Sequence, residues 1–254
     1  MARKPGIEHL KETFSDKENF SRKELYDFYK SYDPDLNETT FRWRIHKLKD
    51  KKIISSVSKD LFTFSYKPVF IPDISETERN IYCKVEQNFP TLKACIWSTK
   101  IINEFMLHMP VNYLTILQVE REAMEPVYFF LKEKEGSNIF IQPGEKEIDR
   151  YIFENNNSII IEPLISKSPV QKVDETTTIT LEKLIVDLFS DKKLFNAYQG
   201  GELSHIINSA YSRYSIDFTK LFYYAKRRGK KEELMEFLFK KTYIPQNILI
   251  NDKY

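Results

Sequence analysis

Basic side chains crowd the stretch from Arg42 to Lys52, which holds six lysines and arginines and a single acid, Asp50. Cations at this density can neutralise phosphates, and phosphate contacts supply the part of nucleic-acid affinity that does not depend on base sequence. Arginine can also pair with a guanine edge, and threonine can offer a hydroxyl or a methyl group to a base. The chemistry predicted for this stretch is therefore binding to a charged polymer.

The elements that must present these cations follow from the periodicity of the stretch. Phe41, Ile45 and Leu48 recur at helical spacing, and Asn37 is a good N-cap, so the cations should lie on a helix with one apolar side. The pattern then changes to alternation, and a turn at Ser58-Lys59-Asp60 joins two predicted strands. A basic helix followed by a two-stranded hairpin is typical of the second half of a winged helix-turn-helix module.

Signals upstream of this helix supply the rest of such a module. Residues 7–14 are amphipathic, and Ser21 with Glu24 forms a capping box that should open a second helix. Asp33-Pro34 should end that helix and supply a turn. We therefore expect residues 1–68 to form a winged helix-turn-helix DNA-binding domain.

In such a domain, bases meet the N-terminal part of the second helix, and phosphates meet its flanks and the tip of the hairpin. The predicted DNA-contacting residues are Thr39, Thr40, Arg42, Trp43, Arg44, Lys47, Lys49 and, in the hairpin turn, Lys59. Two plainer interpretations stay open. The helix could be a solvated amphipathic helix packed on its own domain, or the module could bind protein instead of DNA.

Two closely spaced prolines, Pro68 and Pro72, indicate a boundary, and we expect a second domain over residues 74–254. Strand and helix signals alternate in its first half, which predicts a mixed, mostly parallel sheet with helices. After Pro169 the pattern is wholly helical, and residues 245–254 suggest a loose tail or a late strand. The predicted fold class is α+β or α/β in two domains, with a helical bundle at the C-terminal end.

Few residue patterns in this sequence indicate a catalytic site. The predicted strands end at Ser98, Glu120, Gln142 and Glu162, and parallel strands end at one edge of a sheet, so two carboxylates could meet there as an acid–base pair or a metal site. The simpler interpretation is that polar residues end strands at solvent. The four histidines lie far apart, and the six glycines form no phosphate-binding loop. We expect no enzyme activity, no cofactor and no metal.

The composition fits two packed domains, because the 254 residues are 41% hydrophobic and 14% aromatic. The formal net charge is +2, but residues 1–67 hold fifteen lysines and arginines against eleven acids, so the basic excess lies in the first domain. Cys83 and Cys95 are the only cysteines, and no stretch reads as a secretory signal or a membrane span. These features favour a cytoplasmic protein with reduced, buried thiols and no membrane association.

A second basic cluster lies near the C-terminal end of the predicted bundle. It consists of Lys226, Arg227, Arg228, Lys230 and Lys231, and no acid occurs between Phe218 and Lys231. Such a cluster could hold an acidic partner or nucleic acid. It could equally be a charged helix corner whose cations favour the negative end of the helix dipole.

Three segments, taken in this order, resemble the AbiEi-like antitoxins of type IV toxin–antitoxin systems, which act in abortive infection. They are TTFRWRIHKLKDKKII (39–54), TLEKLIVDLFSD (180–191) and LFYYAKRRGKKEELMEFL (221–238). The resemblance implies a winged-helix transcriptional regulator that binds double-stranded DNA at its own operator. It also implies a C-terminal domain that counters a nucleotidyltransferase toxin without necessarily forming a tight complex with it.

The same resemblance implies that residues 39–47 belong to a recognition helix and residues 226–231 to a basic C-terminal region. The chain departs from the family pattern between Ala94 and Met106, where Cys95-Ile96-Trp97-Ser98-Thr99-Lys100 replaces a glycine-bearing strand-to-helix turn. Oligomeric state and operator sequence stay open.

Two other classes of protein remain as alternatives. A metal-dependent nuclease with a winged-helix targeting domain would need Glu120 and Glu162 close together. A ligand-sensing regulator would need a deep apolar pocket with convergent polar groups in the second domain.

Overall fold

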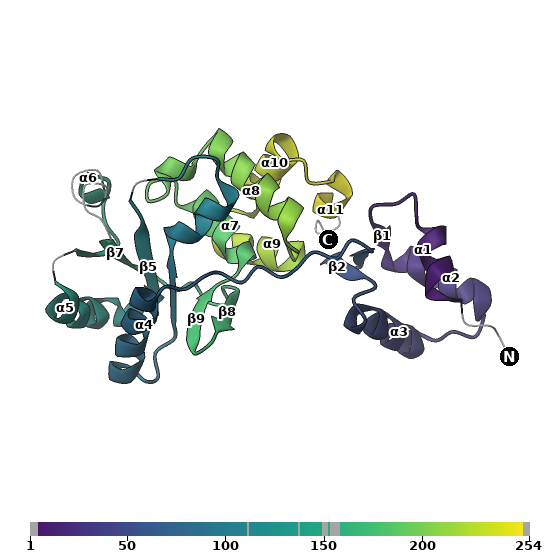
Figure 1. The fold of residues 1–254 in the computed structure, drawn as a ribbon, viewed down its shortest axis with the longest axis horizontal. Coiled ribbons are helices and arrows are strands. Elements are labelled where there is room, and N and C mark those ends of the chain that lie inside the picture. Colours follow the sequence, from purple (N-terminus) through teal and green to yellow (C-terminus); the bar gives the residue numbers. More distant parts are fainter. Residues whose placement is uncertain (1–4, 111, 137, 149–151, 153–157, 251–254) are drawn as a thin grey trace. The chain divides into compact units, whose positions relative to one another are not determined.

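The computed structural model describes residues 5–110, 112–136, 138–148, 152 and 158–250 (Figure 1). The chain is a mixed α/β protein that divides into two compact units. Among the described residues, the first unit comprises 5–69, 213–219 and 244–250, and the second comprises the remainder. Two segments near the C-terminus thus belong to the first unit, although their place in the sequence suggested the second domain.

The first unit contains four helices and a three-stranded antiparallel sheet of order β1-β3-β2 in its described residues. Its elements are α1 (Ile7–Thr13), β1 (Phe20–Ser21), α2 (Arg22–Tyr32), α3 (Glu38–Asp50), β2 (Ser55–Ser58), β3 (Leu61–Thr63) and α11 (Gln246–Ile250). The capping box predicted at the start of α2 is confirmed, because Ser21 accepts from the Glu24 amide and the Glu24 carboxylate accepts from the Ser21 amide. The two-residue strand β1 was too short to leave a periodic signal.

One aromatic-rich core holds the first unit together. Its buried members are Leu10, Phe14, Phe20, Leu25, Phe28, Tyr29, Leu36, Phe41, Ile45, Leu48, Ile54 and Phe62. The rings of Phe14 and Phe20 stack with centroids 4.7 Å apart, and Tyr26 meets Phe41 edge-on at 4.9 Å. Because α3 contributes three side chains to this core, its opposite side is left for other contacts.

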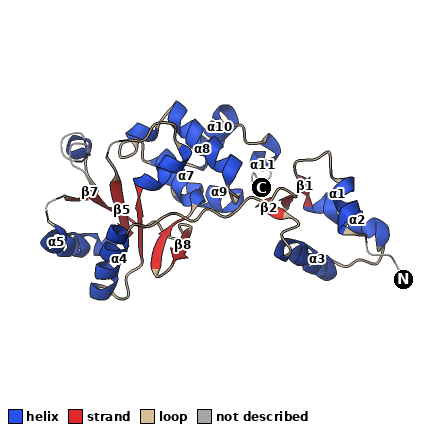
Figure 2. Cartoon of the chain, in the orientation of Figure 1, coloured by secondary structure: helices blue, strands red, loops and turns tan. Residues whose placement is uncertain are grey.

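The second unit combines a mixed sheet, a small hairpin and a group of helices (Figure 2). Its elements are α4 (Glu76–Asn88), β4 (Ala94–Ser98), β5 (Leu114–Val119), α5 (Met124–Glu135), β6 (Ile139–Ile141), α6 (Glu145–Glu147), β7 (Ser158–Pro163), β8 (Val170–Val173), β9 (Thr176–Ile179), α7 (Leu181–Ser190), α8 (Gly201–Arg213), α9 (Phe218–Arg227) and α10 (Lys231–Lys241). Residue 213 of α8 and residues 218 and 219 of α9 fall in the first unit. Short 3-10 helices lie at Thr99–Phe105, Arg121–Ala123 and Asn196–Tyr198.

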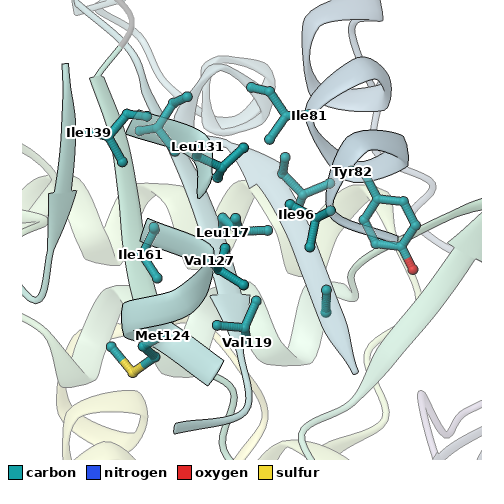
Figure 3. Packing of buried hydrophobic residues seen from close by; sticks show 13 residues of the cluster. Ile81, Tyr82, Ile96, Leu117, Val119, Met124, Val127, Leu131, Ile139 and Ile161 are labelled. Carbon is teal, nitrogen blue, oxygen red and sulfur yellow. The ribbon is translucent and has the colours of Figure 1, made fainter. Parts of the chain in front are cut away.

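The four-stranded sheet has the order β4-β5-β7-β6. β5, β7 and β6 are parallel, and β4 pairs antiparallel with β5. One face packs against α4 and α5 through an aliphatic core that includes Ile96, Leu117, Val127 and Ile161 (Figure 3). Successive side chains of a strand point to opposite faces, so the residues between these core positions lie on the other face of the sheet. Gln118 of β5 is one of them, and it donates to Asp187 of α7.

Three predictions for the second domain are wrong. The chain after Pro169 is not wholly helical, because β8 and β9 form an antiparallel hairpin whose second strand is rich in β-branched residues. The segment after Pro245 contains the helix α11, where we expected a tail or a strand; residues 251–254 lie outside the described residues. We expected both thiols to be buried, but the thiol of Cys83 is exposed on α4.

Among the helix signals in the first half of this domain, the sequence predicts helices at residues 99–107 and 145–153. The first is a 3-10 helix, Thr99–Phe105. The second begins as predicted with α6 (Glu145–Glu147), and residues 149–151 and 153 lie outside the described residues. Within the part of the chain that is described, no helix combines the length and apolar character needed to cross a lipid bilayer.

Candidate nucleic-acid interface

α3 separates its apolar residues from its polar ones. The Asn37 side chain accepts a hydrogen bond from the Thr40 amide at 2.8 Å, which caps the helix at its first turn. Phe41, Ile45 and Leu48 are buried beneath it. The exposed residues of the helix are Glu38, Thr39, Thr40, Arg42, Trp43, His46, Lys47, Lys49 and Asp50. The surface that α3 offers to a partner is therefore polar, cationic and centred on one aromatic ring.

Arg42, Trp43 and Lys47 form the middle of this exposed surface. The Arg42 side chain is 74% exposed, and Trp43 is 55% exposed, which is unusual for so large an apolar residue. The Lys47 ammonium lies 4.1 Å from the centroid of the Trp43 ring, a cation–π contact one helical turn apart. This contact holds a flat apolar surface and a positive charge side by side.

His46 belongs to the same surface and was not among the predicted contact residues. It lies three residues after Trp43, so helical periodicity could have placed it on the same side. Its Nδ1 atom lies 2.9 Å from the Asp50 carboxylate, which orients the ring and leaves Nε2 for an outside partner. The imidazole can thus contact a phosphate or a base edge.

Arg44 does not belong to the exposed surface, contrary to its predicted role as a DNA contact. Its side chain is only 14% exposed and donates to Asp33 Oδ2 at 2.8 Å. Its guanidinium carbon also lies 5.2 Å from the centroid of the Tyr29 ring. Arg44 therefore ties α3 to α2 and to the turn that follows α2.

Lys49 lies toward the hairpin, away from the centre of the exposed surface. Its ammonium is 5.1 Å from the centroid of the Phe62 ring in β3. Burial lowers its pKa, and the nearby Asp217 carboxylate opposes that shift. Its geometry favours packing on the hairpin over a direct contact with a base.

The hairpin turn is fixed by backbone hydrogen bonds on two sides. Asp60 has φ 62°, the left-handed conformation that aspartate tolerates better than most residues. The Arg22 amide donates to the Asp60 carbonyl at 2.7 Å, and the Lys59 amide donates to Thr219 Oγ1 at 2.9 Å. The Lys59 side chain remains exposed, so it stays a candidate phosphate contact.

A charged cluster joins the first turns of α2 and α3 to this hairpin turn. The Arg22 guanidinium donates to Glu38, whose carboxylate also lies 3.5 Å from Arg42 Nε. The Arg22 Nε atom is 3.8 Å from Asp60. The prediction from sequence missed Arg22 and Glu38 as site residues, because only the folded chain brings these three elements together.

The predicted basic cluster near the C-terminus lies where α9 ends and α10 begins. Arg227 donates to the Ser166 hydroxyl, and the Lys230 ammonium is 2.8 Å from Glu233. Lys231 lies 6.0 Å from the centroid of the Phe222 ring. The Arg228 guanidinium lies near Glu162, where it partly offsets the rise that burial causes in the pKa of that carboxyl group. Four of the five predicted cations thus have partners inside their own unit, and Lys226 is exposed.

The predicted site at the strand ends does not assemble as expected. Because β4 runs antiparallel to β5, Ser98 pairs with Thr115 at the opposite edge from Glu120. Gln142 follows β6, and its backbone N–H donates to the Ile161 carbonyl at 3.0 Å. The periodicity of a strand does not encode its direction, which explains the error for Ser98.

The two carboxylates at the strand ends have different surroundings. Glu120 lies 3.7 Å from Lys93 and lines an open cavity of about 710 Å³ together with Arg121 and Lys167. Glu162 does not line that cavity, and burial raises its pKa to about 7, with the Asp191 carboxylate adding to the shift. Within the described ranges, no three histidine, cysteine, aspartate or glutamate side chains gather in a way that could hold a metal ion.

A buried polar network lies between the sheet and α7, beneath α9. Lys183 Nζ lies 2.6 Å from Asp187 Oδ2 and 3.0 Å from the Tyr224 hydroxyl, which donates to Asp187 Oδ1 at 2.7 Å. Gln118 of β5 donates to the same carboxylate at 3.4 Å. Burial and the Asp187 charge raise the pKa of Tyr224, and burial raises the pKa of the neighbouring Cys95 to about 12. Closed off from solvent, this network is suited to holding α7 and α9 in place.

The family model of DUF6577, described as a family of unknown function, matches residues 40–244. The chain belongs to this family. A comparison with curated proteins finds no match. The DUF6577 segment begins in the first turn of α3 and ends before α11, so it includes the hairpin, the basic corner and the buried network. α1 and α2 precede it.

Proposed function

We propose that this member of DUF6577 is a DNA-binding transcriptional regulator whose first unit is a winged helix-turn-helix module. In this proposal α2 and α3 are the helix-turn-helix pair, α3 enters the major groove, and the β2–β3 hairpin is the wing. The order of elements in the first unit, α1-β1-α2-α3-β2-β3, supports this assignment.

The observation that carries the proposal is the exposed surface of α3. An arginine, a tryptophan and a lysine project from it, opposite the three residues that anchor the helix in the core. Arg42 and Lys47 can neutralise phosphates or pair with guanine, and the Trp43 ring can cover the methyl group of a thymine. The Trp43 ring lies among exposed cations in the middle of this helix, where a bound duplex can cover it.

The proposed role within the cell is autoregulation by an antitoxin. The support is the resemblance to AbiEi-like antitoxins, which extends from α3 through the α7 segment to the basic corner at residues 226–231. In this proposal the first unit represses the chain's own operon, and the second unit counters a nucleotidyltransferase toxin encoded beside it.

The test of DNA binding is a mobility shift with the full chain and duplex DNA from directly upstream of its reading frame. We expect a retarded complex that a duplex of scrambled sequence competes for poorly. Equal competition by the scrambled duplex would contradict operator recognition, and no complex with either duplex would contradict DNA binding altogether.

The test of the antitoxin role is co-expression with the neighbouring gene product. We expect the neighbouring protein to arrest growth alone and the full chain to relieve the arrest. A chain carrying Arg42→Ala and Lys47→Ala should still relieve it, because the proposal assigns toxin neutralisation to the second unit. Failure of the unmodified chain to restore growth would refute the antitoxin role and leave the DNA-binding role standing.

A further inference from the structure

The carboxylate of Glu38 lies between two arginines from different helices. The Arg22 guanidinium, in the first turn of α2, donates to Glu38 Oε1. The Arg42 Nε atom, one turn further along α3, is 3.5 Å from the same oxygen. Two planar cations thus converge on a single anionic oxygen.

Glu38 and Arg22 line a shallow hollow with several other charged residues. Its volume is about 470 Å³, and Lys23, Tyr26, Lys59 and Asp60 line it together with the Arg22–Glu38 pair. Arg22 is held in position, because its guanidinium carbon lies 4.9 Å from the centroid of the buried Phe41 ring and its Nε atom lies near Asp60. The cations that surround Glu38 therefore come from α2, α3 and the hairpin turn.

This arrangement suits a phosphate better than a carboxylate. Guanidinium groups bind phosphate oxygens through paired, charge-assisted hydrogen bonds, and a phosphodiester offers two such oxygens. The Glu38 side chain is 53% exposed, so its ion pairs are screened by water and can exchange for another anion at little cost. An incoming phosphate would find Arg22 already in place, and the exposed Arg42 side chain can turn to the same phosphate.

We propose that this hollow is the seat of one backbone phosphate of bound DNA, and that Glu38 fills it in the free protein. This inference rests on the proposed DNA-binding function of the first unit. Glu38 acts as an anionic plug: it lowers the affinity for every duplex, so that only a sequence making additional contacts with α3 is bound well. The phosphate displaces the carboxylate, which then turns to solvent.

Fluorescence anisotropy with the full chain and two labelled duplexes, one from the upstream region and one scrambled, tests this proposal. Glu38→Gln should bind both duplexes about fivefold more tightly, because one negative charge beside the phosphate is removed. The matched control is Glu76→Gln, which removes the same charge from the exposed first turn of α4 and should leave both affinities unchanged. Arg22→Ala should weaken both complexes and lower the slope of affinity against salt by about one.

The outcomes separate the plug from other roles of Glu38. Weaker binding of Glu38→Gln to the upstream duplex alone would mean that Glu38 accepts a hydrogen bond from a cytosine amino group, and the plug would be overturned. Unchanged binding to both duplexes would overturn it as well. If the unmodified chain binds neither duplex, the proposed function itself fails, and the plug fails with it. Circular dichroism of Arg22→Ala establishes that a loss of affinity does not reflect unfolding.

Discussion

An acid and a base lie four residues apart in both α3 and α7, and these two pairs have opposite surroundings. In α3, Glu38 and Arg42 are 53% and 74% exposed. In α7, Lys183 and Asp187 are 0% and 3% exposed. Each pair joins a carboxylate to a cation at the same spacing, and the largest difference between the two pairs is their burial.

Burial decides whether such a pair can be exchanged. An exposed pair is screened by water and contributes about 0.2–1 kcal/mol, so a phosphate can replace one member. A buried pair cannot lose one member without leaving an unpaired charge in a region that excludes water. Tyr224 and Gln118 complete the hydrogen bonds of Asp187, which fixes that pair further. We infer that α3 uses its charges for binding and that α7 uses its charges for structure.

Lys183→Met should have the largest effect. It leaves the Asp187 carboxylate buried without its cation, so the free energy of unfolding should fall by about 3–5 kcal/mol. Urea unfolding followed by circular dichroism measures this change. The double variant Lys183→Met/Asp187→Leu should lose less than the sum of the two single variants. A loss below about 1 kcal/mol for Lys183→Met would show that water reaches the pair.

Glu162 should make stability depend on pH. Its pKa is about 7 in the folded protein against 4.5 for the free side chain, so the folded state holds the proton more tightly. The stabilising contribution is complete below about pH 4.5 and is lost as the pH rises to about 7, with a total of up to about 3 kcal/mol. Glu162→Gln stays neutral and should therefore be more stable than the unmodified chain at about pH 8 and equal to it at about pH 4. Urea unfolding across this range gives the comparison, and parallel pH profiles for the two proteins would contradict it.

Arg44→Ala tests the intermediate case, because the pair with Asp33 is only partly exposed. Loss of the ion pair and of packing on Tyr29 should lower stability by about 1 kcal/mol. The matched control Arg42→Ala, one of two arginines paired with Glu38 in the same helix, should cost less than about 0.5 kcal/mol. Thermal unfolding of the two variants side by side measures the difference, and a reversed order would contradict the assignment of Arg44 to structure.

Local signals in the sequence were sufficient for much of the fold. The capping box at Ser21 begins a helix as predicted, because its hydrogen bonds involve residues three apart. The spacing of Phe41, Ile45 and Leu48 correctly gave the buried side of α3. Short strands such as β1 and β8 were missed because two to four residues carry too little periodic signal.

Long-range pairing limited the prediction of the site. Arg44 lies three residues after Phe41, so helical periodicity places it beside the buried side of α3, but its partner Asp33 comes from outside the helix and only the folded chain shows it. The meeting of Arg22 with Glu38 depends on how α2 packs on α3. The direction of β4, which separates Ser98 from Glu120, likewise depends on strand pairing. Residue types therefore suggested a cationic surface, and tertiary packing decided which cations belong to it.

The central claim, that the exposed surface of α3 contacts DNA phosphates, is tested most directly by the salt dependence of binding. The affinity of the full chain for its upstream duplex should fall steeply as salt is raised. The variant Arg42→Ala/Lys47→Ala should bind more weakly, with a slope of log affinity against log salt that is smaller by about two. The control variant Lys146→Ala/Lys240→Ala, with both cations exposed in the second unit, should keep the original slope. An unchanged slope in the α3 variant would contradict the account.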